Sequence, residues 1–285
     1  MTQRLYSSLK QLPGIRALIQ TTWWKVRRHR LTLALSPRRN CHFTCFLRLP
    51  TQFEALSGPV LDFLTQGGHT KALDIAVIGC STGAEAYSIA SVLRQRHPDL
   101  SFTVRAYDID RECLEKARSG RYTREEVFRT DLSGRTTVTA DFIGATFDIE
   151  DGSYVVKRDV KKHVQFGWAD ALDPNLRARI GSSDIVYAQH ILIHLAARDA
   201  KTAFRNVCLL LNRKAVLFVA GLDLHVLQEQ TRTHDLVPSE YKIGEIYREM
   251  NAFSNGWPWS YTALEPFMTV RKEWQRRYST IFFKG

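Results

Sequence analysis

The residues best suited to chemistry follow a short apolar run at 74–78, in the stretch DIAVIGCSTGAEAYSIA. Gly79 and Gly83 leave the backbone without side chains where this run ends, and helix-forming residues begin at once. The pattern predicts a strand, a glycine-rich turn and a helix, which is how an open α/β sheet receives a nucleotide-like ligand at its carboxyl edge. The free amide groups at the start of the helix can then bind that ligand.

Polar side chains also follow the next predicted strands. Asp108 ends the strand at 102–108, where a carboxylate can accept hydrogen bonds from both hydroxyls of a ribose. Asp110 is better placed than Asp108 to cap the following helix, which leaves Asp108 for a ligand. Because the carboxyl ends of parallel strands meet at one edge of a sheet, we expect the strand ends to form one site. The third and fourth strands bring to this edge Asp170, Gln189, His190 and His194.

Glu85 narrows the choice of ligand. The turn lacks both the third glycine of a dinucleotide-binding motif and the Gly-Lys-Ser/Thr of a P-loop. An acid in the first turn of the helix would repel a pyrophosphate, whereas it would attract a cationic amino-acid group. S-adenosylmethionine carries an ammonium and a sulfonium, so the residues indicate this compound as the cofactor.

The elements that must position these residues alternate along the chain. From residue 66 to 285 short apolar strands alternate with helices, which predicts an α/β fold with a mainly parallel sheet covered on both faces. Residues 1–65 read as a mostly helical N-terminal domain. The expected core strands are 74–79, 102–108, 163–168, 184–189, 215–220 and 278–283.

Two segments interrupt this alternation. Residues 134–167 contain TTVTADF, ATFDI and SYVV with a turn at Asp151-Gly152, and we expect them to form a small antiparallel β insertion. Residues 222–277 are rich in His, Trp and Tyr and are expected to form a lid-like insertion over the acceptor. The alternative is that this second segment is an additional helix pair that covers the sheet.

Four longer motifs follow one another along the chain, namely TCFLRLPTQFEAL at 44–56, GCSTGAEAYSIA at 79–90, YDIDRECLEKARSGRY at 107–122 and DGSYVVKRDVKKHVQF at 151–166. Through these motifs the chain resembles, over roughly residues 40–220, the chemotaxis receptor methyltransferases of the CheR type. The resemblance implies a Rossmann-like class I methyltransferase fold, S-adenosylmethionine as the cofactor, and methyl transfer to a carboxylate oxygen. It does not extend to residues 222–277.

The resemblance also implies roles for individual residues. Thr44 and Arg48 would line the cofactor and acceptor pocket. The methionine part of the cofactor would contact Gly79, Ser81 and Glu85. Its ribose would contact Asp108, and its adenine would lie beside Asp170 and Ala171. Gln189 and His190 complete the cofactor-binding set, at positions where the family has Arg and Asn.

The chain departs from the family where the acceptor should lie. Gln189 replaces an Arg, which removes a bidentate partner for a carboxylate, and His194 replaces a Tyr. We expect Arg48, His190 and His194 to form the catalytic group. The two imidazoles can act as bases for an alcohol, phenol or amine acceptor, or they can be hydrogen-bonding residues with only a structural role.

Composition restricts the class of protein. The chain has 285 residues, a net charge of +11 and five scattered cysteines, which indicate a cytoplasmic protein without a disulfide framework or a metal site. No apolar run is long enough for a membrane span. The basic segment at 23–39 is a solvated helix face or a docking surface for an acidic partner, nucleic acid or an anionic membrane.

The sequence therefore predicts an S-adenosylmethionine-dependent methyltransferase. The favoured reaction is O-methylation of a carboxylate or hydroxyl on a small or medium-sized metabolite. The first alternative is a protein-glutamate methyltransferase that acts on a signalling partner, and the second is a non-catalytic sensor or scaffold that binds the cofactor. Net charge alone suggests a nucleic-acid methyltransferase, but the chain has no Asn-Pro-Pro-Tyr-like motif, so nucleic acid is an unlikely partner.

Overall fold

The computed structural model describes residues 43–66, 72–130, 136–252 and 267–285, together with Thr21, Trp24 and Arg27. Most of the predicted N-terminal helical domain and of the basic segment lies outside the described residues. Residues 43–49 at the described end of that domain are not helical, whereas 50–65 are helical, as expected from their apolar spacing, apart from Gly58, where the backbone leaves helical geometry. The helical part comprises α4 (Pro50–Ala55), the π-helical η1 (Leu56–Val60) and α5 (Leu61–Thr65).

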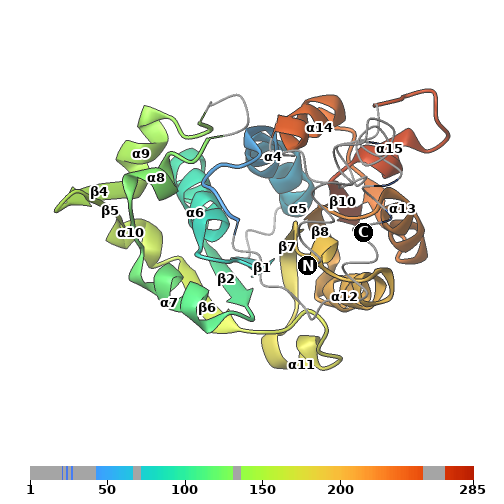
Figure 1. The fold of residues 1–285 in the computed structure, drawn as a ribbon, viewed down its shortest axis with the longest axis horizontal. Coiled ribbons are helices and arrows are strands. Elements are labelled where there is room, and N and C mark those ends of the chain that lie inside the picture. Colours follow the sequence, from blue (N-terminus) through green and yellow to red (C-terminus); the bar gives the residue numbers. More distant parts are fainter. Residues whose placement is uncertain are drawn as a thin grey trace, which may run out of the picture.

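A seven-stranded sheet forms the centre of the molecule (Figure 1). The strand order is β6-β2-β1-β7-β8-β10-β9, and β10 runs antiparallel to both of its neighbours. The predicted α/β, Rossmann-like architecture is confirmed. Six of the strands lie close to their predicted positions, whereas β9 was not predicted. The strands are β1 (Leu73–Ile78), β2 (Phe102–Asp108), β6 (Val164–Trp168), β7 (Ser183–Gln189), β8 (Leu211–Ala220), β9 (Val237–Pro238) and β10 (Ile281–Lys284).

Helices cover both faces of the sheet, so its central strands are apolar on both sides. In β7, for example, Ile185 and Tyr187 pack on one face while Val186 and Ala188 pack on the other. The first face is covered by α4, α5 and α6 (Ala84–Arg96). The second face is covered by α11 (Leu176–Ile180), α12 (Ala197–Leu209) and α13 (Leu224–Thr233). The remaining described helices are α7 (Arg111–Ser119), α8 (Arg124–Val127), α9 (Ala140–Thr146), α10 (Arg158–Lys161), the 3-10 helix η2 (Leu192–His194), α14 (Ile243–Ala252) and α15 (Trp274–Tyr278).

A second, three-stranded antiparallel sheet of β3 (Arg121–Tyr122), β4 (Phe147–Glu150) and β5 (Ser153–Val156) lies at the opposite end of the molecule from α13 and α15 (Figure 1). Strands β4 and β5 fall within the segment 134–167 that was expected to form a β insertion, whereas β3 precedes that segment. Asp151 and Gly152 form its tight turn with φ angles of 49° and 74°, as two-residue hairpins require. The expectation of a strand at TTVTADF is wrong. Thr139 accepts a hydrogen bond from the Phe142 amide and thereby caps α9 instead.

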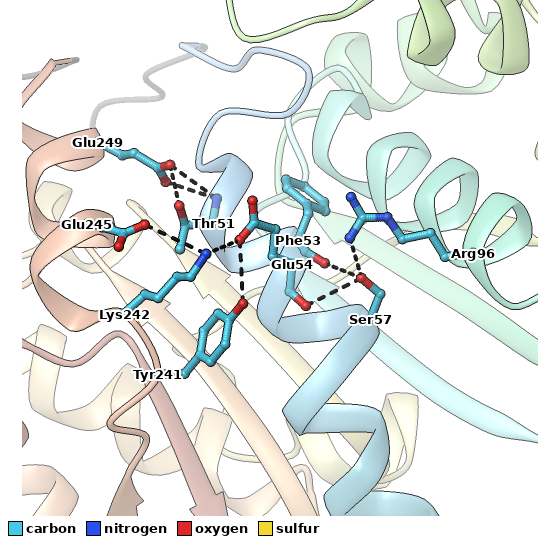
Figure 2. Close-up of polar contacts among 9 residues, drawn as sticks. All are labelled: Thr51, Phe53, Glu54, Ser57, Arg96, Tyr241, Lys242, Glu245 and Glu249. Carbon is cyan, nitrogen blue, oxygen red and sulfur yellow. Dashed lines mark hydrogen bonds and ion pairs between the residues drawn. The ribbon is translucent and has the colours of Figure 1, made fainter.

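The segment expected to form a lid-like insertion contributes several elements to the body of the protein. Its helix α13 packs in the core on the second face, and β9 extends the sheet beyond β10. Its helix α14 contacts α4, where Glu249 accepts hydrogen bonds from Thr51 (Figure 2). Residues 253–266 lie outside the described residues. A lid role for this segment remains a prediction, and its described elements follow the alternative of helices that cover the sheet.

Candidate functional site

The turn between β1 and α6 requires glycine at both predicted positions. Gly79 has a φ of 77°, and a Cβ placed there would lie 2.0 Å from Cγ2 of Ile191. Gly83 has a φ of 88° and directly precedes α6. Because side chains rarely adopt such φ angles, only glycine lets the chain turn from the strand into the helix this closely. The turn at the end of β1 therefore carries no side chain at Gly79 or Gly83, while the contact of this backbone with a ligand remains a prediction.

Asp108 holds this turn against the tip of β2. One carboxylate oxygen, Oδ2, accepts a hydrogen bond from the Ser81 amide at 2.7 Å, and the other accepts one from the Asp110 amide at 2.9 Å. Each carboxylate oxygen can accept a second bond, so Asp108 keeps acceptor capacity for a ribose. Asp110 caps α7 through the amides of Glu112 and Cys113, which confirms its predicted role.

Glu85 lies in the first turn of α6 and is largely enclosed by protein. Burial raises its pKa to about 7, and the guanidinium of Arg48 opposes this shift. Removing a carboxylate from water is costly unless a cation compensates for its charge. Glu85 is therefore poised to accept a cationic ligand group, as proposed for the ammonium of the cofactor.

Arg48 belongs to a small cluster of aromatic and cationic side chains. Its Cζ lies 5.0 Å from the ring centroid of Phe43, and Cζ of Arg129 lies 5.1 Å from the same centroid. Arg129 also donates a hydrogen bond to the carbonyl oxygen of Thr44 at 3.1 Å. Thr44 and Arg48 are thus in one group, although Thr44 contributes its backbone to this contact. Sequence reasoning missed Phe43 and Arg129, because Arg129 lies in a distant segment with no motif of its own.

The carboxyl end of β7 presents polar atoms that lack hydrogen-bond partners. Within the described part of the chain, Oη of Tyr187, Oε1 of Gln189 and Nε2 of His190 are buried without a partner. Buried polar groups in native proteins are almost always satisfied, so these atoms indicate a polar ligand or ordered water. Tyr187 was missed, but the signal was present: in a strand, residues 187 and 189 face the same side of the sheet.

Gln189 is less available to a cofactor than predicted. Its Nε2 donates to Oε1 of Gln52 at 2.8 Å, and Nε2 of Gln52 donates to Oγ1 of Thr280 at 2.6 Å. The side chain therefore connects β7 to α4 and to the residue that precedes β10. Only its unpartnered Oε1 remains for a ligand.

His190 has a left-handed backbone with a φ of 56°, and it packs closely against Gly221. A Cβ on Gly221 would lie 2.8 Å from both Cα and Nδ1 of His190. Burial lowers the pKa of His190 well below its ordinary value, and the nearby charges of Arg48 and His194 lower it further. The imidazole is therefore neutral at physiological pH and is a weak base. His194 lies in η2 and is only partly buried.

The adenine side of the predicted site follows β6. Oδ1 of Asp170 accepts a hydrogen bond from the Leu172 amide at 2.8 Å, which closes a local turn. Ala171 is buried, and its carbonyl oxygen accepts a hydrogen bond from Asn206. Trp168 is exposed nearby, and it pairs with Asp108 across β2 and β6. These contacts place Asp170 and Ala171 beside the tip that carries Asp108, whereas their contact with adenine remains a prediction.

Within the described ranges, no group of three or more His, Cys, Asp or Glu side chains is arranged to hold a metal ion. The described helices also include none with the length and apolar character that a bilayer span requires.

Comparison with known proteins identifies the family. The family model described as CheR methyltransferase, SAM binding domain, matches residues 42–242. The chain belongs to this family. The CheR domain therefore extends over the described site from Phe43 to β7 and continues through α13 and β9. The predicted class I methyltransferase fold, the enzyme class and S-adenosylmethionine as the cofactor are confirmed at this level.

Two curated relatives share this domain. The chain is 26% identical over 214 residues to the probable biofilm formation methyltransferase WspC of Pseudomonas aeruginosa, which covers 75% of this chain and 48% of the relative. It is 27% identical over 180 residues to chemotaxis protein methyltransferase 2 of Vibrio cholerae, with coverage of 62% and 60%. The chain thus spans about half the length of WspC. Among solved structures, magnesium protoporphyrin IX methyltransferase of Synechocystis PCC 6803 has a TM-score of 0.38 at 14% identity, with coverage of 79% of this chain and 86% of that one.

The described residues fit S-adenosylmethionine. Glu85 offers a desolvated carboxylate to a cation, and Asp108 offers free acceptor positions beside a glycine-rich turn. The unpartnered atoms of Tyr187 and Gln189 on β7, and of His190 directly after it, add further polar groups at the same edge of the sheet. When bound, the cofactor supplies an electrophilic methyl group on sulfur.

Proposed function

We propose that this protein methylates glutamate carboxylates on a signalling protein, with S-adenosylmethionine as the methyl donor. This is the first alternative that the sequence left open. It is favoured over the small-molecule acceptor because relatives are named as chemotaxis protein and biofilm formation methyltransferases. The CheR family match supports the methyl donor and the class of reaction.

One observation carries the choice of an anionic acceptor: two guanidinium groups, those of Arg48 and Arg129, gather around the exposed ring of Phe43. A carboxylate approaching the buried Glu85 would be repelled unless cations lie beside it. Two guanidinium groups provide that compensation and can also form bidentate hydrogen bonds to carboxylates. In this proposal Arg48 has two roles, since its charge lowers the pKa of Glu85 and its guanidinium orients the acceptor.

The state of His190 supports the same acceptor. A hydroxyl acceptor gains from a base that removes its proton during transfer, and His190 is a weak base because its pKa is lowered. A glutamate carboxylate is already ionised at neutral pH and attacks the methyl carbon directly. As the new oxygen–carbon bond forms, the sulfur–carbon bond breaks and its electron pair remains on sulfur. The neutral imidazole of His190 then serves only as a hydrogen-bonding group.

The test is incubation of the protein with methyl-labelled S-adenosylmethionine and an extract of its host, separated into protein and small-molecule fractions. We expect label in the protein fraction, released by base as volatile methanol, which marks a carboxyl ester. The variant Asp108→Ala should transfer no label. Label in the small-molecule fraction, base-stable label on protein, or cofactor binding without any labelled product would each contradict the proposal.

A further inference from the structure

Helix α4 begins without a cap from its own sequence. Pro50 occupies the first helical position and has no amide proton, and Leu49 provides no side-chain cap. The next amide, that of Thr51, donates to both carboxylate oxygens of Glu249 at 3.2 Å. The Thr51 hydroxyl donates to Oε1 of Glu249 at 2.6 Å (Figure 2). A carboxylate on α14 therefore caps a helix that lies almost two hundred residues earlier in the chain.

This capped end leads directly into Arg48. Only Leu49 and Pro50 separate Arg48 from Thr51, and Leu49 is buried. On the other side of Arg48, the Leu47 amide donates to Oγ of Ser88 at 3.1 Å. Ser88 belongs to α6, the helix that also carries Glu85. The backbone of Arg48 is thus attached to α6 on one side and to α14 on the other.

We infer that Glu249 is a positioning residue that, by capping α4, fixes where the Arg48 guanidinium lies relative to Glu85. The inference goes beyond the proposed function, because it concerns the cofactor side of the site and holds for any acceptor. Within the described part of 222–277, α14 therefore affects the site indirectly, through the contact of Glu249 with Thr51 at the start of α4. The geometry also predicts that a substitution at Glu249 on α14 changes the pKa of Glu85 on α6.

Two other carboxylates near the start of α14 are weaker candidates for this role. Lys242, which directly precedes α14, pairs with Glu54 at 2.8 Å, but Lys242 is exposed, and exposed ion pairs contribute little. Glu245 lies on the solvent side of α14, where its nearest described cationic partner is Lys242 at 3.8 Å. Glu249 is partly buried, so its hydrogen bonds are less screened by water. Glu245 is therefore a matched control on the same helix.

A readout that does not need the acceptor is the pH dependence of S-adenosylhomocysteine binding. Glu85 must be ionised to hold the ammonium of this product, so affinity should rise with pH up to the pKa of Glu85 in the free protein. Arg48 lowers that pKa, while Cys45, Cys80 and Tyr187 are the other titratable groups that interact with Glu85. If Arg48 moves away, the midpoint of the pH dependence moves upward.

The experiment is calorimetry with S-adenosylhomocysteine from pH 5.5 to 8.5 on the intact protein and four variants. Arg48→Gln should raise the midpoint by about one pH unit, the lower end of the effect of a nearby opposite charge. Glu249→Gln should raise it in the same direction by a measurable part of that shift, and Glu245→Gln should leave it unchanged. In the double variant of Arg48 and Glu249 the midpoint should equal that of Arg48→Gln alone.

Two results would overturn the inference. One is a wild-type midpoint in folded Glu249→Gln, and the other is a shift that persists after Arg48 has been replaced. If Glu249→Gln fails to fold, Thr51→Val removes only the contact at 2.6 Å and keeps the Thr51 amide as a donor. That variant should give a smaller upward shift, and an unchanged midpoint would again contradict the positioning role. These binding measurements use no methyl acceptor. If the protein does not methylate glutamate, the measurements are unaffected, so failure of the proposed function can be distinguished from failure of this inference.

Discussion

The charge of Glu85 depends on the pH at which the cell operates. Burial raises its pKa to about 7, so the ligand-free site contains comparable amounts of acid and carboxylate near neutrality. The folded protein binds this proton more tightly than the unfolded chain does. The contribution of Glu85 to stability therefore decreases as pH rises from about 4.5 towards 7, the interval between its ordinary and its raised pKa.

The first prediction concerns Glu85→Gln. The affinity of the intact protein for S-adenosylhomocysteine should rise up to about tenfold per pH unit between pH 5.5 and 7, because one proton must leave Glu85. The variant should bind at least about tenfold more weakly at pH 8 and show a flat pH profile in this range. At pH 8 the ligand-free variant should also unfold at a higher temperature than the wild type, because it buries no charge. Calorimetry and thermal melts provide the measurements, and a sloping profile in the variant would refute the assignment.

Sequence reasoning at this scale found groups whose neighbours are local. Asp110 follows the strand that ends at Asp108, and helix-capping rules alone identified Asp110 as the cap of α7. The partner of Gln189 could not be predicted in this way, because Gln52 lies 137 residues away and no pattern couples the two amides. The lowered pKa of His190 could not be predicted from the sequence either, because it depends on burial by residues from several parts of the fold.

Among the elements, the turn from β1 into α6 tolerates the fewest residue types, because it needs glycine at position 79. Gly79 combines a positive φ with a space that Ile191 already occupies. Helix α9 shows the opposite case, because β-branched residues suggested a strand and a threonine cap selected a helix. Strand β9 was missed for a related reason. It has two residues and becomes a strand only through pairing with β10.

The second prediction compares two glycine substitutions. Gly79→Ala should lower the free energy of unfolding by about 2 kcal/mol or more, from the positive φ and the overlap with Ile191. It should also abolish cofactor binding, because the turn must shift. Gly144→Ala, in the exposed middle of α9 with open space around it, should instead raise stability by about 0.5–1 kcal/mol. Chemical denaturation of both variants gives the two values, and equal effects would contradict this account of Gly79.

At the scale of the whole molecule, the alternation of strands and helices predicted the sheet and its site-bearing edge. The strand order could not be taken from the alternation alone, because β10 enters between β8 and β9 in the opposite direction. Ile281 and Phe282 of β10 are 1% and 0% exposed. Burying two such side chains contributes roughly 3–6 kcal/mol, a large part of the roughly 5–15 kcal/mol that stabilise a typical domain.

The third prediction is that a chain ending at Tyr278 does not fold cooperatively. Removing 279–285 deletes β10, exposes the edge of β8 and leaves β9 without a partner. A chain that lacks only the exposed Gly285 is the control and should melt within about 2 °C of the wild type, because it loses no buried side chain. Circular dichroism on heating measures both. A sharp transition in the shorter chain at the temperature of the control would show that β10 is dispensable.

The position of β10 has a consequence for synthesis on the ribosome. The strands that supply the glycine-rich turn, Asp108 and Gln189 are all translated before β10 and can begin to pair as the nascent chain emerges. Yet Gln52 bonds to Thr280, and the carbonyl of Thr280 accepts from the Val219 amide at 2.8 Å. The helix that follows Arg48 therefore acquires this anchor only after the segment around Thr280 has emerged from the exit tunnel.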